Sequence, residues 1–172
     1  GAMKTYGQYC PIARASEVFA ERWTPLIVRN IFLGCETLAT IQAGAPGIPR
    51  SLLQQRLRML EQIGVVKRVE KAQGRGSRYL LTDAGQELWE VCDALGRWGT
   101  RWLEAAAWHL DPYIVLWSFT QGAQAERLPG GHVTVQLDFV DQPRKNRHFW
   151  LVLDRGDIEL CVTDPGFEPD LV

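Results

Sequence analysis

The sequence predicts an α+β protein in which helices and one hairpin come first and a small antiparallel sheet follows. Apolar residues recur every three or four positions through most of the first two thirds of the chain, as in amphipathic helices. Two short β-prone runs within residues 65–81 interrupt this pattern around a glycine-rich stretch. From residue 133 onwards apolar and polar residues alternate, as they do in strands that bury one face.

Three helices are expected before a breaker cluster at residues 44–47. The first starts after Cys10, where a proline suits the first helical turn. Its apolar face comprises Ile12, Ala15, Val18 and Phe19. The second starts with Thr24 as its cap and ends at Gly34, and the third fits residues 37–43.

A fourth helix is expected over residues 50–62, ahead of Gly64. Its apolar stripe comprises Leu53, Leu57, Leu60 and Ile63. The opposite face offers guanidinium, hydroxyl and amide groups from Arg50, Ser51, Gln54, Gln55 and Arg58. Arginine forks bind guanine or phosphate and amides pair with adenine, so this face has the chemistry of a DNA contact. The alternative is an ordinary solvated helix surface.

A hairpin is expected over residues 65–81, with a flexible, basic, glycine-rich tip. Thr82 then caps a long helix over residues 83–108, which Asp111 and the following proline break. That helix has more apolar side chains than one internal face requires, namely Leu88, Val91, Leu95, Trp98 and Trp102. An exposed apolar stripe marks an association surface, so we expect dimer packing there, including Trp89.

The last third of the chain predicts a short helix at residues 113–121 and three strands. Alternation begins the first strand at Val133, and the next two fit residues 148–153 and 158–162. We therefore expect two domains, 1–110 and 111–172.

The charge is unevenly distributed although its net value is −1. Residues 49–82 contain eight basic and two acidic residues, whereas residues 111–172 contain ten acidic and five basic ones. A compact basic block in a neutral chain is typical of a nucleic-acid face. Within it, we expect Arg50, Ser51, Gln54 and Gln55 to discriminate bases. The residues expected to hold phosphates or the minor groove are Arg58, Lys71, Arg75 and Arg78.

The expected order of elements is three helices, a helix with a polar and basic face, and a hairpin with a basic tip. This is the order of elements in a winged helix-turn-helix. In that fold a recognition helix enters the major groove and the hairpin reaches the neighbouring backbone or minor groove. The expected partner is double-stranded DNA. The alternative is an apolar-ligand carrier or protein-interaction module whose winged helix does not bind DNA, and the salt dependence of binding would separate the two.

Other function classes lack support in the sequence. The histidines are scattered, and neither a G-x-S-x-G nor a Walker motif occurs, so we expect no enzyme. The four cysteines form no C-x-x-C pair, so neither a metal nor a cofactor is expected. No apolar run approaches the roughly 18 residues of a membrane span. The N-terminus has no signal-peptide pattern, so the expected location is the cytoplasm, without membrane association. The cysteines are then expected to be reduced thiols.

Several spaced motifs over residues 8–108 resemble the HxlR-type branch of the MarR-like winged-helix regulators. They comprise Cys10-Pro11-Ile12, Arg22-Trp23-Thr24, Leu33-Gly34, Pro46-Gly47-Ile48, Ser51 to Leu57, Leu60-Glu61, Gly64-Val65-Val66 and Tyr79 to Thr82. The resemblance implies a homodimeric, ligand- or redox-responsive transcription regulator, a repressor, whose fourth helix binds DNA and whose wing is the hairpin. Residues 38–41 depart from the usual phenylalanine-led start of the third helix.

Residues 111–172 are similar to the sterol-carrier-protein type of domain. The similarity rests on Asp111-Pro112, Val115-Leu116-Trp117, Trp150 to Leu153, Leu160-Cys161 and Thr163 to Phe167. It implies a sheet with helices around a pocket for a small apolar effector, here shorter than the full domain and so expected to be truncated. Trp117 and Trp150 are the ligand-binding candidates, although burial in a core is the alternative for both.

Cys10 is a candidate redox sensor because it precedes a predicted helix start. Backbone N–H groups and the helix dipole favour a thiolate at such a position. The resemblance adds that some regulators of this branch use a cysteine here as a redox switch. A small half-buried side chain is the alternative.

Overall fold

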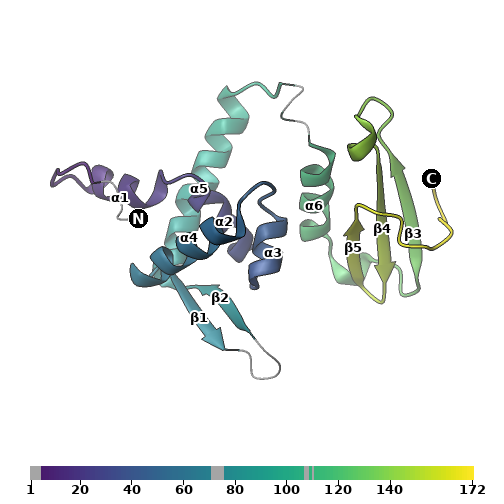
Figure 1. The fold of residues 1–172 in the computed structure, drawn as a ribbon, viewed down its shortest axis with the longest axis horizontal. Coiled ribbons are helices and arrows are strands. Elements are labelled where there is room, and N and C mark those ends of the chain that lie inside the picture. The colour runs from purple at the N-terminus through teal and green to yellow at the C-terminus, as the bar shows by residue number, and fades with distance from the viewer. Residues whose placement is uncertain (1–4, 71–75, 107–108, 110) are drawn as a thin grey trace. The chain divides into compact units, whose positions relative to one another are not determined.

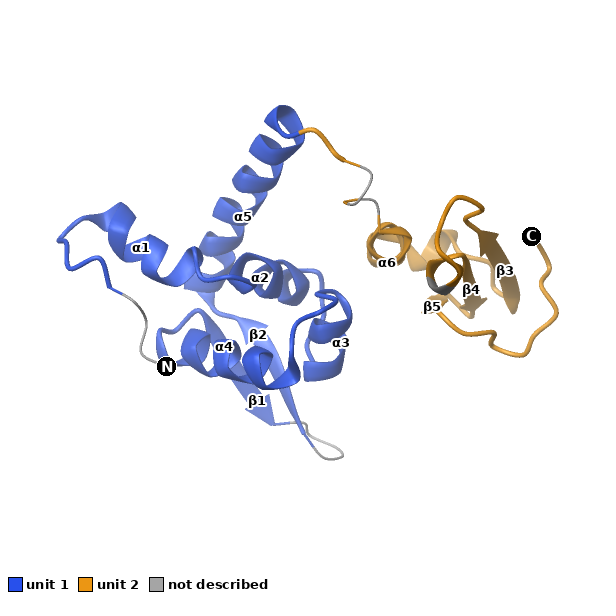
Figure 2. Ribbon diagram, turned by 45° about the horizontal axis from the view of Figure 1, so that its top comes forward, with its two compact units in different colours: residues 1–103 blue, residues 104–172 orange. Residues whose placement is uncertain are grey.

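The computed structural model describes residues 5–70, 76–106, 109 and 111–172. The chain forms two compact units, residues 1–103 and residues 104–172 (Figures 1 and 2). Helices and a two-stranded hairpin make up the first unit, and a helix with a three-stranded sheet makes up the second. This combination confirms the predicted α+β class.

Three short helices open the first unit: α1 (Pro11–Phe19), α2 (Thr24–Phe32) and α3 (Leu38–Ala43). Thr37 caps α3, and its hydroxyl accepts a hydrogen bond from the Thr40 N–H at 3.2 Å. The predicted cap of α2 is wrong. Trp23 is the N-cap, with φ at +81°, and this left-handed residue already places Thr24 inside the helix. Among the described residues, the buried Thr24 hydroxyl has no hydrogen-bond partner.

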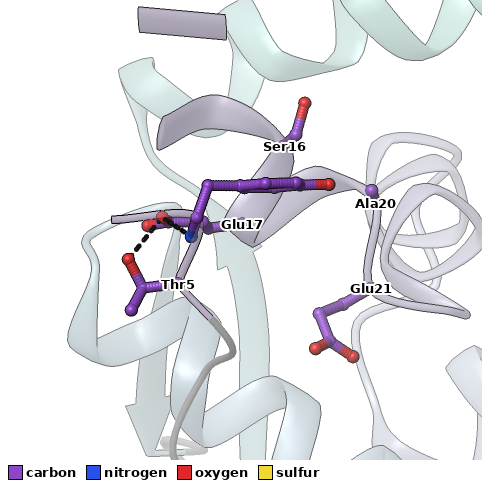
Figure 3. Close-up of a pocket in the computed structure, with 6 residues that line it drawn as sticks. Thr5, Ser16, Glu17, Ala20 and Glu21 are labelled. Atoms are coloured by element: carbon purple, nitrogen blue, oxygen red, sulfur yellow. Dashed lines mark hydrogen bonds between the residues drawn. The ribbon is translucent and has the colours of Figure 1, made fainter. Parts of the chain in front are cut away.

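The face predicted to be apolar on α1 is not its buried face. Ile12 is 78% exposed, whereas Glu17 is only 5% exposed. The Glu17 carboxylate is covered by the preceding segment, whose Thr5 hydroxyl donates to it at 2.7 Å and whose Tyr6 N–H donates at 2.8 Å (Figure 3). These two hydrogen bonds, the Thr5 bond first, lower the pKa of Glu17. The covered face of α1 thus contains a carboxylate whose burial is compensated by hydrogen bonds.

The core of the first unit is formed where α2, α3 and α4 (Arg50–Gln62) meet. The apolar stripe predicted for α4 is buried at Leu53, Leu57 and Leu60, beside the equally buried Ile27 and Ile41. Ile63, the last member of the predicted stripe, is exposed because the helix has already ended and Ile63 is its C-cap. With three leucines fixed in the core, the polar face of α4 points to solvent.

The hairpin consists of β1 (Val66–Glu70) and β2 (Ser77–Leu81), paired antiparallel from Val66 opposite Leu81 to Glu70 opposite Ser77. It leaves the helical core as a projecting wing (Figure 1). The N–H of Tyr79 donates to the Glu36 carbonyl at 2.7 Å, and this bond ties β2 to the segment between α2 and α3.

Helix α5 (Asp83–Trp102) packs against α2 and the end of the hairpin. Thr82 caps it as predicted, accepting a hydrogen bond from the Gly85 N–H at 3.2 Å. The helix ends at Trp102 and not at residue 108. Its buried residues, Gly85 and Cys92, lie in its first half, so its last turn lacks the packing that stabilises most helices.

The second unit begins with α6 (Pro112–Gly122), followed by the short 3-10 turn η2 (Ala125–Arg127). Its sheet has the order β3-β4-β5, all antiparallel. The strands are β3 (Val133–Asp138), β4 (His148–Asp154) and β5 (Asp157–Cys161), with the turn η3 (Arg144–Asn146) ahead of β4. The C-terminal segment, residues 170–172, lies along the edge of β3 that does not pair with β4, where Leu171 pairs in parallel with Val135.

Candidate nucleic-acid interface

Helix α4 presents the predicted polar groups on one exposed surface. Arg50, Ser51, Gln54 and Arg58 are exposed, and Gln55 is partly exposed. The buried leucine stripe on the opposite side holds the helix in place, so these side chains project without contributing to the core. The described arrangement brings five of the eight predicted DNA-contacting side chains together on one helix. Of the remaining three, Lys71 and Arg75 lie outside the described residues.

Acidic residues neutralise part of the basic block. Arg78 forms an ion pair with Glu36, in which its Nε donates to Oε2 at 2.5 Å. Arg56 pairs with Glu21, and its side chain is only 16% exposed. In the hairpin, Arg68 is the third basic side chain with an acidic neighbour. Its Nε donates to the Ser77 hydroxyl at 2.7 Å, and its guanidinium lies near Glu70.

Three basic side chains of this block are free of ion pairs in the part of the chain that the structure describes. They are Arg50 and Arg58 on α4 and Lys67 on β1, all exposed. Their charges are the ones fully available to phosphates in the unbound protein. Lys67 was not among the residues singled out from the sequence, although its position in a strand of the hairpin is the signal that could have identified it.

A buried polar network joins α2 to α3. Asn30 is fully buried, and its Nδ2 donates to the Ile41 carbonyl at 2.8 Å. Its Oδ1 accepts from Arg29 Nε at 3.0 Å, and Arg29 Nη2 donates to the Gly44 carbonyl at 2.6 Å. Burial lowers the pKa of Arg29. Because these bonds reach both the body and the end of α3, they fix the turn that leads into α4.

Four residues of the apolar stripe predicted on the long helix are exposed in the single chain, whereas the fifth, Leu88, is only partly exposed. Trp98 is 54% and Trp102 63% exposed, and Val91 and Leu95 are each about half exposed. Trp89 differs from them because it stacks on Phe32 with ring centroids 4.3 Å apart. The four exposed residues thus form an apolar surface, with the Arg101 guanidinium 5.3 Å from the Trp102 ring centroid, whereas Trp89 packs within the chain.

The four cysteines occupy different environments. Cys10 is the N-cap of α1, is half-buried, and lines a pocket of about 190 Å³ with Tyr9, Pro11 and Arg14. Burial raises the pKa of Cys35, and it raises the pKa of Cys92 to about 11. Burial also raises the pKa of Cys161, with a smaller contribution from Glu159.

The two tryptophans proposed from the sequence as ligand contacts are placed differently. Trp117 is 6% exposed and is one of the buried apolar residues of the second unit. Trp150 lies on the face of β4 opposite the buried Phe149 and Leu151, between its cross-strand partners Gln136 and Cys161. The structure therefore places Trp150 on the more open face of the sheet and Trp117 in the core.

Neither a metal site nor a membrane-spanning helix is found in the described part of the chain. Within the described ranges, no three histidine, cysteine or acidic side chains are grouped as metal ligands would be. Among the helices of the same described part, none combines the length and the apolar character needed to cross a membrane.

Two curated relatives each match a little over half of the chain. The regulator Rv3095 of Mycobacterium tuberculosis (strain ATCC 25618 / H37Rv), an HTH-type transcriptional regulator, is 38% identical over 93 residues, which are 54% of this chain and 58% of that protein. The HTH-type transcriptional regulator YvaP of Bacillus subtilis (strain 168) is 32% identical over 100 residues, which are 56% of this chain and 92% of that protein. The chain thus spans less than two thirds of the mycobacterial relative.

Solved structures show the same fold. The crystal structure of PA1607 superimposes with a TM-score of 0.54 at 33% identity, over 59% of this chain and 70% of that one. A MarR-family regulator from Porphyromonas gingivalis W83 superimposes with a TM-score of 0.51 at 24% identity, over 58% of this chain and 99% of that one. These likenesses confirm the winged helix-turn-helix fold. The family model described as "HxlR-like helix-turn-helix" matches residues 18–107, and the chain belongs to that family.

Proposed function

We propose that the protein is a sequence-specific, double-stranded-DNA-binding transcription regulator that acts as a homodimer. One observation carries the proposal: α4 projects a contiguous polar face from a helix whose other side is buried in the core. A recognition helix requires this combination, because base contacts need rigidly held, exposed donors and acceptors. Membership of a helix-turn-helix family supports the same conclusion.

The proposed interface divides base contacts from backbone contacts. Arg50, Ser51, Gln54 and Gln55 lie in the first half of α4, the part that enters the major groove in such proteins. The residues proposed to hold phosphates or the minor groove are Arg58, Lys71, Arg75 and Arg78. Arg58 lies two turns after Arg50 on the same exposed side of α4, which suits a backbone contact beside the groove.

Replacing Gln54 by alanine should relax specificity, whereas replacing Arg58 should weaken binding to every sequence. Loss of a paired base contact costs about 1–3 kcal/mol at one base pair. Loss of a phosphate contact reduces the salt slope of the binding constant by about 0.9 for each site. The measurement is fluorescence anisotropy over a salt series, with operators first selected from a random library by the purified protein.

Arg97→Ala is the matched control for Arg58→Ala, since it removes an exposed arginine of α5 that is paired with Asp93. It should leave the salt slope unchanged. Equal salt slopes and equal base preferences in the wild type and in both α4 variants would contradict the division of roles. A wild-type protein that selects no sequence from the library would contradict the proposed function itself.

The dimer proposal rests on the exposed stripe of α5. A single recognition helix makes few base contacts, so two of them, on half-sites about one helical turn or roughly 34 Å apart, would supply the specificity. We assign DNA binding and dimerisation to residues 1–110 and an effector-binding role, leading to repression or its release, to residues 111–172.

The effector-binding assignment uses the similarity of residues 111–172 to the sterol-carrier-protein type of domain. A small apolar ligand is the proposed effector, with Trp117 and Trp150 as candidate contacts. Trp150 is the more accessible candidate, because a ligand that reaches Trp117 has to enter the buried core. Such a ligand can regulate DNA binding only through different affinities for the competent and incompetent dimers.

We also propose Cys10 as a redox-responsive residue, and thiol labelling tests this. At neutral pH a maleimide should modify Cys10 first, because only a thiolate reacts and burial raises the pKa of Cys35, Cys92 and Cys161. Cys92, with a pKa of about 11, should stay unmodified until the chain unfolds. Timed labelling followed by peptide mass spectrometry gives the order.

Cys10→Ser is the control and should remove the fast labelling phase alone. Slow labelling of Cys10, together with unchanged DNA affinity after peroxide treatment, would rule out the sensor role. Fast labelling of Cys92 would show instead that α2 and α5 separate readily in solution.

A further inference from the structure

The ion pair between Glu36 and Arg78 joins the helical core to the wing. Arg78 Nε donates to Glu36 Oε2 at 2.5 Å, and Nη2 contacts the same carboxylate oxygen. The carbonyl of Glu36 also accepts the Tyr79 N–H at 2.7 Å. A single residue between α2 and α3 therefore contacts β2 through its side chain and through its main chain.

The two contacts have different consequences for the wing. The main-chain bond to Tyr79 positions β2 and does not depend on the side chain at residue 36. The carboxylate cancels the charge of Arg78, one of the residues proposed to hold DNA phosphates. A substitution that keeps the shape of Glu36 and removes its charge therefore separates the two roles.

The pair remains open to a competing anion. The Arg78 side chain is 47% exposed and that of Glu36 is 29% exposed. Ion pairs in such surroundings are weak, because water and salt screen them. An arginine has five N–H donors, and those not used by Glu36 can meet a phosphate that then replaces the carboxylate.

We propose that Glu36 contributes to the sequence specificity of DNA binding by neutralising Arg78 until the wing is docked. This inference rests on the proposed DNA-binding function. On an arbitrary duplex α4 does not seat fully, so Arg78 stays with Glu36 and adds little attraction. On an operator the seated α4 brings β2 to the backbone, and a phosphate takes the place of the carboxylate. Glu36 is a positioning residue that acts through Arg78.

Glu36→Gln tests the proposal on the full chain. The variant keeps the side-chain size and the carbonyl that binds Tyr79. Its affinity for a fluorescent random-sequence duplex should rise about threefold to tenfold, and the salt slope should steepen by about 0.9 per protomer, because Arg78 then displaces one more counterion. Its affinity for a selected operator should rise less, so the ratio of the two affinities falls.

Two controls identify the cause. Glu90→Gln makes the same change in charge at an exposed position of α5 that lies off the apolar stripe, and it should leave both affinities unchanged. In an Arg78→Ala background, Glu36→Gln should no longer alter the salt slope.

The outcomes separate the inference from the function on which it rests. If the wild type binds DNA and Glu36→Gln leaves its slope and affinity ratio unaltered, or alters them equally without Arg78, the inference is wrong and the proposed function stands. If the wild type binds no duplex at any salt concentration, both are wrong.

Discussion

Trp98→Glu is expected to separate the proposed dimer into monomers and to abolish operator binding. Trp98 belongs to the exposed apolar stripe of α5 and would be buried in the proposed dimer. Truncation of a buried tryptophan alone costs about 3–5 kcal/mol. Glutamate adds the cost of burying a charge. Because a symmetric interface contains the substitution twice, the total destabilisation of the dimer is larger still. Sedimentation velocity at micromolar concentration measures the mass, and anisotropy measures DNA affinity on the same samples.

Gln86→Glu is the matched control for this experiment. It introduces the same side chain on α5 at an exposed position about 160° around the helix from the middle of the stripe. It should leave both the mass and the DNA affinity unaltered. A wild-type protein that sediments as a monomer, or a Trp98→Glu variant that remains dimeric, would contradict the assignment of this surface.

Gly85→Ala is expected to destabilise the first unit severely. A Cβ at residue 85 would lie 2.3 Å from the Val65 carbonyl oxygen and 3.0 Å from Leu81 Cβ. The neighbouring atom is main chain and cannot rotate away, so the N-terminus of α5 has to move off the hairpin. Overpacking of this kind costs about 1–3 kcal/mol and occasionally more, and we expect the upper end. Urea unfolding gives the change in free energy.

Gly96→Ala provides the comparison on the same helix. Nothing described lies within 4 Å of a Cβ at residue 96, so alanine should stabilise the helix by about 0.5–1 kcal/mol. The two substitutions are chemically identical and should act in opposite directions. Similar unfolding midpoints for both variants would show that α5 does not approach Val65 this closely.

Local patterns were sufficient to predict most elements of the chain. The leucine spacing of α4 and the Thr82 cap of α5 are short-range features, and both were confirmed. The hairpin and the three strands of the second unit also follow from alternation and turn residues. Errors arose where tertiary structure overrides a local preference, as at the end of α5 and at the N-cap Trp23, whose left-handed backbone has no local signal.

The charge balance of the candidate site was not predictable in the same way. Arg56 and Arg78 were counted as basic charges, yet their partners Glu21 and Glu36 are 35 and 42 residues away in sequence. Hydrophobic periodicity gives no information about such pairs, since it reports only which face of an element is buried. The positive charge available at the site is known only from the folded structure, which places Glu36 beside Arg78 on the wing and Glu21 beside Arg56 on α4.

The C-terminal segment also determines how the sheet of the second unit should exchange its amide hydrogens. The N–H of Gln136 donates to the Leu171 carbonyl at 2.9 Å, and the N–H of Thr134 donates to the Asp170 carboxylate at 2.8 Å. Protection of these two amides depends on the last few residues of the chain and not on the pairing of β3 with β4. Deuterium uptake at residues 134 and 136 therefore reports detachment of the C-terminal segment, whereas uptake in β4 reports opening of the sheet itself.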